Sequence, residues 1–268
     1  MSRHLFSILP LAVLLASAAG AQSDDRTQRW LRNCNDDSQR DRARFCELRE
    51  YSLRPTSQLM VNGGDNGGVS FIGWDRDEVK VIAMIQAQAD DEGGARSLAR
   101  EVKVGAAGGS VQAEGPRSWG RNSWSVSYNV YVPRRSNLRA ITKNGGVSAE
   151  SVEGTMEFRA TNGGIRLDAV GGDIRAETTN GGVNARLSGT TWRGRGLDLR
   201  TTNGGVDVTV PRGYNARLET GTVNGPMNVN FPITVQGRIG RHVETQLGTG
   251  GPVIRATTTN GGVRISER

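Results

Sequence analysis

Residues 144–185 read NGGVSAESVEGTMEFRATNGGIRLDAVGGDIRAETTNGGVNA, and this stretch decides the fold. It holds three copies of the tripeptide Asn-Gly-Gly, which begin 18 residues apart at Asn144, Asn162 and Asn180. Further copies begin at Asn62, Asn66, Asn203 and Asn260, and Asn224-Gly-Pro is a degenerate copy. Because Asn and Gly enter positive-φ conformations at low cost, the repeat predicts the same tight corner in every period.

Apolar residues alternate after every corner, which is typical of strands that are buried on one face. The pairs are Val147 and Ala149, Ile165 and Leu167, Val183 and Ala185, Val206 and Val208, Met227 and Val229, and Val263 and Ile265. A second, weaker turn follows about nine residues after a corner, as in residues 152–156 and 170–174. Each period therefore holds at least two strands and two turns.

Two all-β folds explain this pattern. Asn-Gly between alternating strands is a strong hairpin signal, which would give an antiparallel meander or sandwich. The near-identity of the corners favours a parallel β-solenoid, because stacked coils reward the same residue on every level. We expect columns of Asn side chains, and of Thr161, Thr179, Thr202 and Thr259, along the stack. The corner residues are Asn144, Gly145, Gly146, Asn162, Gly163, Gly164, Asn180, Gly181, Gly182, Asn203, Gly204, Gly205, Asn260, Gly261 and Gly262.

The repeated run NGGV…VEG…TNGGI…VGGDI…TTNGGV resembles a bacterial adhesin-like β-solenoid family of unknown biochemical function. The resemblance covers residues 138–268, and GVSFIGWDRDEV at 68–79 is similar to an earlier piece of the same family. It implies an exported β-helical protein. It supplies no catalytic residue.

The chain divides into four parts. Residues 1–21 have a basic start, an apolar run and the small-residue sequence Ala19-Gly20-Ala21, and they read as a secretory signal peptide. Residues 22–52 read as a small helical cap, 53–137 as an irregular β region with a helix near 94–102, and 138–268 as the repeat solenoid. The mature protein is expected in the periplasm, on the outer surface or secreted, with no membrane span.

The two cysteines of the chain, Cys34 and Cys46, are 12 positions apart. In an oxidising compartment such a pair predicts a disulfide. The bridge would fasten the N-terminal cap.

The formal net charge is +7, and all but three of the 34 basic residues are Arg. Such a balance would draw an exported protein to anionic envelope glycans or lipids, and the alternative is that Arg simply decorates the outward strand positions. Surface proteins are a further class of candidate partner. The basic residues are dispersed, so nucleic acid is not expected as a partner. The last repeat ends three residues from the end of the sequence given, which would leave its strand edge open for end-to-end self-association.

Little in the sequence indicates an enzyme. Past residue 21 the only His is His242, and it has Glu244 nearby but no nucleophile motif. The carboxylates of Asp168, Asp173, Glu177, Asp198 and Asp207 alternate outward and read as surface charges. Only Gly171-Gly172-Asp173 comes near a calcium-binding repeat. We predict no catalytic residue, cofactor or metal.

Four of the five tryptophans are candidate platforms for sugar binding: Trp74, Trp119, Trp124 and Trp192. Trp124 alternates with apolar residues and is expected in the core. Trp192 lies in the longest period between consecutive corners of residues 144–224, where extra residues would form an outward loop. It is therefore the candidate ligand contact, and local packing is the alternative for this ring. The sequence as a whole predicts a non-enzymatic adhesin-like surface or envelope scaffold. The alternatives are an envelope-stress or regulatory sensor and, less favoured, a polysaccharide-active β-helix enzyme.

Overall fold

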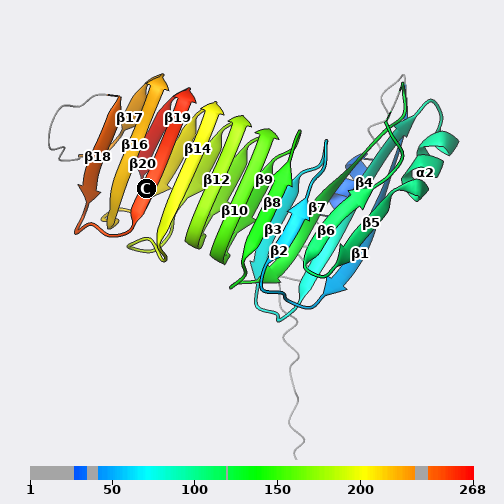
Figure 1. Ribbon diagram of the computed structural model, residues 1–268, viewed down its shortest axis with the longest axis horizontal. Coiled ribbons are helices and arrows are strands. Elements are labelled where there is room, and N and C mark those ends of the chain that lie inside the picture. Colours follow the sequence, from blue (N-terminus) through cyan, green and yellow to red (C-terminus); the bar gives the residue numbers. More distant parts are fainter. Residues whose placement is uncertain (1–26, 35–41, 119, 233–240) are drawn as a thin grey trace, which may run out of the picture.

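The computed structural model describes residues 27–34, 42–118, 120–232 and 241–268. Within these residues, two ten-stranded sheets are layered along a long axis (Figure 1). Sheet A contains, in spatial order, β1 (Ala43–Leu53), β4 (Val79–Ala89), β7 (Ser123–Pro133), β3 (Val69–Trp74), β9 (Val147–Glu150), β11 (Ile165–Asp168), β13 (Val183–Arg186), β15 (Val206–Val210), β20 (Val263–Glu267) and β17 (Met227–Val229). Sheet B contains β18 (His242–Leu247), β16 (Ala216–Asn224), β19 (Val253–Asn260), β14 (Gly196–Asn203), β12 (Gly171–Asn180), β10 (Glu153–Asn162), β8 (Leu138–Thr142), β2 (Leu59–Asn62), β6 (Ser110–Glu114) and β5 (Lys103–Ala107).

Each sequence period forms one coil of two strands. In the coil that starts with β10, the chain leaves sheet B at the Asn162 corner, enters sheet A as β11, and returns to sheet B as β12. Adjacent coils pair in parallel and in register, so that Asn162 lies beside Asn180 and Ile165 beside Val183. The expected solenoid is confirmed as a flattened stack, and the hairpin meander is wrong for the repeats.

The space between the sheets is filled by the alternating apolar residues. The predicted pairs from Val147 to Val208, together with Val263 and Ile265, are buried, whereas Met227 and Val229 are only partly buried. Full burial of one such aliphatic side chain stabilises the fold by about 1.5–3 kcal/mol. The core is therefore a continuous apolar ladder along the stack.

The first glycine of each corner is required by close backbone approach. A Cβ on Gly181 would lie under 3.0 Å from the carbonyl oxygen of Gly163 on the next coil, and Gly163 meets Gly145 in the same way. The expected positive φ is wrong for most corners: among their described residues only Gly64 and Gly261 adopt it. The non-glycine residues with positive φ, Ser151 and Ala169, lie at the second turn instead.

A ladder of amide side chains joins the corners. In each step the Nδ2 of one Asn donates to the Oδ1 of the Asn on the adjacent coil, over 2.7 to 3.1 Å. The ladder runs through Asn66, Asn144, Asn162, Asn180, Asn203, Asn260 and Asn224. Asn62 does not join these steps, because its Oδ1 accepts from the backbone N–H of Gly64.

The threonine column differs from the expectation by one residue. Thr161, Thr179, Thr202 and Thr259 are exposed. The residue before each of Thr179, Thr202 and Thr259 is the buried member: the hydroxyls of Thr178, Thr201 and Thr258 donate to Gly carbonyl oxygens of the adjacent coil at 2.7–2.8 Å. The strand alternation places these threonines inward.

The order of the coils in space differs from their order in the chain. The last coil, β19 and β20, lies between the β14–β15 coil and the β16–β17 coil. At the other end, the β2–β3 coil lies between β6–β7 and β8–β9 in the same manner. The final repeat is therefore paired on both sides, and the predicted open edge at this repeat, on which end-to-end association was based, is wrong.

The alternation of charges on the outer face of sheet B agrees with the insertion of the last coil between the two earlier coils. One row across the coils reads Arg139, Glu157, Arg175, Asp198, Arg255 and Glu219. In chain order, Asp198 would lie beside Glu219, and the two like charges would repel. Insertion of Arg255 between them gives opposite neighbours, and its Nε donates to Glu219 at 2.9 Å.

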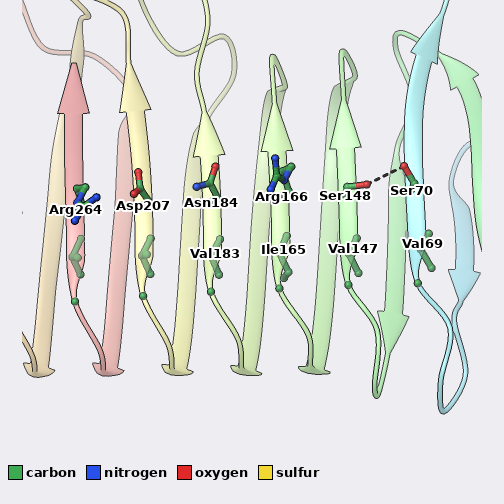
Figure 2. A pocket seen from close by; sticks show the side chains of 18 of the residues that line it. Val69, Ser70, Val147, Ser148, Ile165, Arg166, Val183, Asn184, Asp207 and Arg264 are labelled. Atoms are coloured by element: carbon green, nitrogen blue, oxygen red, sulfur yellow. Dashed lines mark hydrogen bonds between the residues drawn. The ribbon is translucent and has the colours of Figure 1, made fainter. Parts of the chain in front are cut away.

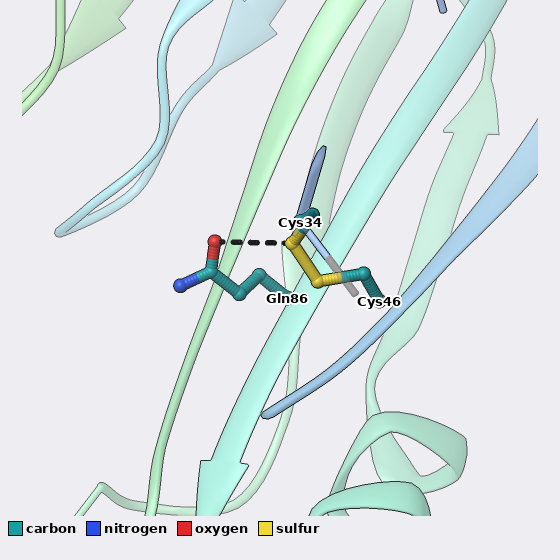
Figure 3. The surroundings of a disulfide bond; sticks show 3 residues. All are labelled: Cys34, Cys46 and Gln86. Carbon is teal, nitrogen blue, oxygen red and sulfur yellow. Dashed lines mark hydrogen bonds between the residues drawn. A yellow bond between two sulfur atoms is a disulfide. The ribbon is translucent and has the colours of Figure 1, made fainter. Parts of the chain in front are cut away.

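The N-terminal cap is only partly helical. Residues 27–34 are helical, but 43–53 form strand β1 at the end of sheet A, so the expected helical cap is wrong over that stretch. The predicted disulfide between Cys34 and Cys46 is confirmed and fastens the helix to β1, next to Gln86 of β4 (Figure 3). The second helix, α2 (Glu92–Glu101), agrees with the prediction near 94–102. Residues 1–21 lie outside the described residues, so the signal peptide stays a prediction.

Gly181→Ala should destabilise the fold strongly, because the added methyl group would collide with backbone that cannot move without shifting a coil. We expect a loss of more than about 2 kcal/mol in the free energy of unfolding, measured by urea denaturation. The control is Gly182→Ala, whose Cβ would meet the Gly205 oxygen at an ordinary 3.4 Å. Equal stability of the two variants would contradict the stacking constraint.

Arg255→Glu should lower the free energy of unfolding by about 2 kcal/mol, because it leaves the mostly buried Glu219 beside a like charge. The double variant Arg255→Glu with Glu219→Arg should recover part of the loss, because that pair is again opposite in sign. An unchanged urea midpoint in Arg255→Glu would show that the alternation does not support the coil order.

Candidate functional site

A long groove of about 840 Å³ crosses the outer face of sheet A near the Asn-Gly-Gly corners. It runs across the strands and not along them, from Met84 on β4 and Asn129 on β7 to Pro226 and Asn228 at the other end. Figure 2 shows the row of side chains that stand on successive strands along it.

One wall of the groove consists of the second glycine of each corner. These residues are Gly68, Gly146, Gly164, Gly182, Gly205 and Gly262, with Pro226 in the last position. Their carbonyl oxygens accept from the first strand residue of the adjacent coil, as Gly182 does from Ile165 at 2.9 Å. Since a glycine has no side chain, each corner leaves bare backbone beside the strand, and the stack joins these gaps into a trough.

The degenerate corner at Asn224 fits the same arrangement. Pro226 replaces the second glycine, and its carbonyl oxygen accepts from Val263 at 3.0 Å as a glycine carbonyl would. Its coil is the outermost parallel coil at this end of the described stack. The irregular tripeptide thus closes one end of the groove.

The other wall is a row of polar side chains, one from each strand. In spatial order the row reads Asn129, Ser70, Ser148, Arg166, Asn184, Asp207, Arg264 and Asn228. Ser148 donates to Ser70 at 2.9 Å. In the described part of the chain, the side chains of Arg166, Asn184, Asp207 and Arg264 make no hydrogen bond or ion pair.

On the outer face of sheet B, by contrast, charged side chains pair with one another. Arg175 pairs with Glu177 at 3.2 Å, and Arg200 pairs with Asp198 at 2.8 Å. Surface charges that neutralise one another in this way offer little to a ligand. The groove row instead carries charged side chains that have no such partner among the described residues. Of its members, only Asp207 was considered from the sequence, and it was interpreted as an ordinary surface charge.

Trp192, the predicted ligand contact, is not exposed. Only 3 % of its surface is accessible, and its Nε1 donates to the carbonyl oxygen of Gly172 at 3.0 Å. The extra residues of the long period fold this ring back into the core, so the prediction is wrong.

Neither Trp74 nor Trp124, the other two candidates within the described residues, lines the groove. Trp124 is half-buried and donates to Pro116 at 2.7 Å. Trp74 packs against Tyr131 and has Arg76 over its ring. Trp119 lies outside the described residues.

The candidate carboxylates act mainly as surface partners of arginines. Asp168 pairs with Arg186, Asp173 with Arg195, and Glu177 with Arg175. Asp198 pairs with Arg200, whereas Asp207 lies in the groove row. Exposed His242 lies 3.6 Å from Glu244. The described residues contain no group of three or more His, Cys, Asp or Glu that could hold a metal ion.

Tyr128 is the one strongly perturbed acid at the groove. Burial raises the pKa of its hydroxyl far above the usual range, and among the described residues that hydroxyl has no hydrogen-bond partner. The strand alternation turns this ring toward the core. It stays protonated at neutral pH and supplies no base.

A comparison with protein families identifies the family of this chain. Residues 82–266 match the model of the Toastrack DUF4097 family, and the chain belongs to that family. Nothing among curated proteins matches it. No helix of the described residues is long and apolar enough to cross a membrane.

Solved structures that match the chain include a candidate cell adhesion protein from Clostridium sporogenes, with 14% identity and a TM-score of 0.44, covering 84% of this chain and 100% of that one. A candidate adhesin from Parabacteroides merdae has 11% identity and a TM-score of 0.33, covering 83% and 96%. A candidate lipid-binding protein from Parabacteroides distasonis has 12% identity and a TM-score of 0.31, covering 83% and 96%. Scores this low carry no ligand from one protein to another.

Trp192→Ala should lower the free energy of unfolding by about 3–5 kcal/mol, as expected for a large core side chain. Trp192→Phe keeps most of the packing but loses the hydrogen bond to Gly172, and should cost about 1 kcal/mol. Denaturant melts measure both. A Trp192→Ala variant as stable as the parent would contradict the buried position of this ring.

Proposed function

We propose that this protein is a non-catalytic, adhesin-like scaffold of the bacterial cell envelope, and that the groove across sheet A is its binding surface. The observation that carries the proposal is the polar row of Arg166, Asn184, Asp207 and Arg264, which have no side-chain partner in the part of the chain that the structure describes and lie beside a trough of bare backbone. Rigid sheets hold this row at fixed spacing. A site built on such elements is preorganised for a ligand that spans several coils.

A binding role accounts for the groove better than catalysis does. Hydrolysis of a glycan by the common route needs two carboxyl groups on either side of one bond. The groove row offers one carboxylate, Asp207, between Asn184 and Arg264. The carboxylates of Asp168, Asp173, Glu177 and Asp198 pair with arginines instead.

An envelope location follows from the predicted signal peptide of residues 1–21 and is supported by the disulfide, which is typical of oxidising compartments. The periplasm, the outer surface and the medium are all consistent with it. The basic balance of the chain would favour anionic partners in each place.

Asn184→Trp tests the role of the groove, because this exposed residue stands at its centre and an indole there would fill the trough. Labelled protein is sedimented with isolated envelopes of the producing bacterium. We expect apparent affinity to fall at least about tenfold, since the ligand loses its path across the coils.

The matched control is Thr179→Trp, which adds the same ring to an exposed position on sheet B. It should bind as the parent protein does. Equal binding by parent, Asn184→Trp and Thr179→Trp would show that the groove is not the binding surface.

A further inference from the structure

We propose that the groove binds a linear acidic polysaccharide, with Arg166 and Arg264 holding its carboxylate groups. This inference rests on the proposed function and names the ligand class of the same site. It follows from the spacing, the charge and the direction of the polar row.

The row presents one polar side chain per strand at a regular interval. Neighbouring strands lie about 4.8 Å apart, so Arg166 and Arg264, three strands apart in register, lie roughly 14 Å apart. Asn184 and Asp207 fill the two positions between them. A ligand that contacts both arginines must be extended across the strands and must offer hydrogen-bonding groups along its length.

The charges of the row favour an anion that also carries hydroxyl groups. A guanidinium binds a carboxylate through two parallel hydrogen bonds, and neither Arg166 nor Arg264 has a carboxylate partner among the described residues. Asp207 can accept from hydroxyls, and Asn184 can both donate and accept. Ser148 and Ser70 extend this set beyond Arg166. Uronic acid polymers combine these groups.

The direction of the groove argues against a peptide bound by strand addition, and its polar row argues against a lipid chain. A peptide that binds by strand addition needs the open edge of a sheet, whereas this groove crosses the face of sheet A. A lipid chain would bury Arg166, Asn184 and Asp207 without hydrogen bonds, which is costly. A polysaccharide satisfies these groups and needs no sheet edge.

Calorimetry with polygalacturonate oligosaccharides and with the same oligosaccharides after carboxyl reduction tests the inference. The parent protein should bind the acidic form, more weakly as salt rises, and lose at least about tenfold in affinity for the reduced form. Arg166→Gln and Arg264→Gln should each weaken binding about tenfold, because each removes one charged hydrogen-bonded contact.

The control is Arg175→Gln, which removes the same charge from the paired face of sheet B and should change affinity less than about twofold. Equal losses in all three variants would mean that net charge and not the groove attracts the polymer, and would overturn the inference. Equal affinity for the acidic and the carboxyl-reduced oligosaccharides would also overturn the inference.

The calorimetry and the envelope sedimentation experiment test the ligand class and the binding surface separately. If Asn184→Trp abolishes envelope binding while polygalacturonate does not bind, the groove is the binding surface and its ligand is not a carboxylated polysaccharide. If Asn184→Trp leaves envelope binding unchanged, the proposed function itself fails.

Discussion

The close approach of successive corner backbones governs this structure. The first glycine of each corner lies against the corresponding glycine of the adjacent coil, and no side chain fits between them. This contact brings the corner asparagines within hydrogen-bonding reach and holds the coils in register. The second glycine then leaves bare backbone on the outer face of sheet A. The same tripeptide that stacks the coils therefore also shapes the groove.

The two faces of the stack are used differently. On sheet B, arginines and carboxylates alternate between coils and neutralise one another, and this pattern agrees with the insertion of the last coil between two earlier ones. On sheet A, the row beside the glycines keeps Arg166, Asp207 and Arg264 unpaired among the described residues. The two faces of one repeat therefore differ in how their charged side chains are paired.

The repeat made much of the fold predictable. Strict alternation after Asn144 or Asn162 indicates an inward and an outward face, and near-identical corners indicate parallel stacking. The order of the coils was not predictable from spacing, because Asn260 can pair with Asn203 or Asn224 only when distant segments meet. Trp192 was misplaced because an insertion can fold inward as readily as outward. The groove row was missed because Arg166 and Arg264 read as ordinary surface charges until their missing partners are seen.

A crystal structure with a short acidic oligosaccharide would show whether the stacked corners create a ligand groove. We expect a sugar chain that lies across the strands of sheet A between Ser148 and Arg264, with carboxylates on Arg166 and Arg264. An oligosaccharide bound only on sheet B or at an end of the stack, with the glycine trough empty, would contradict it.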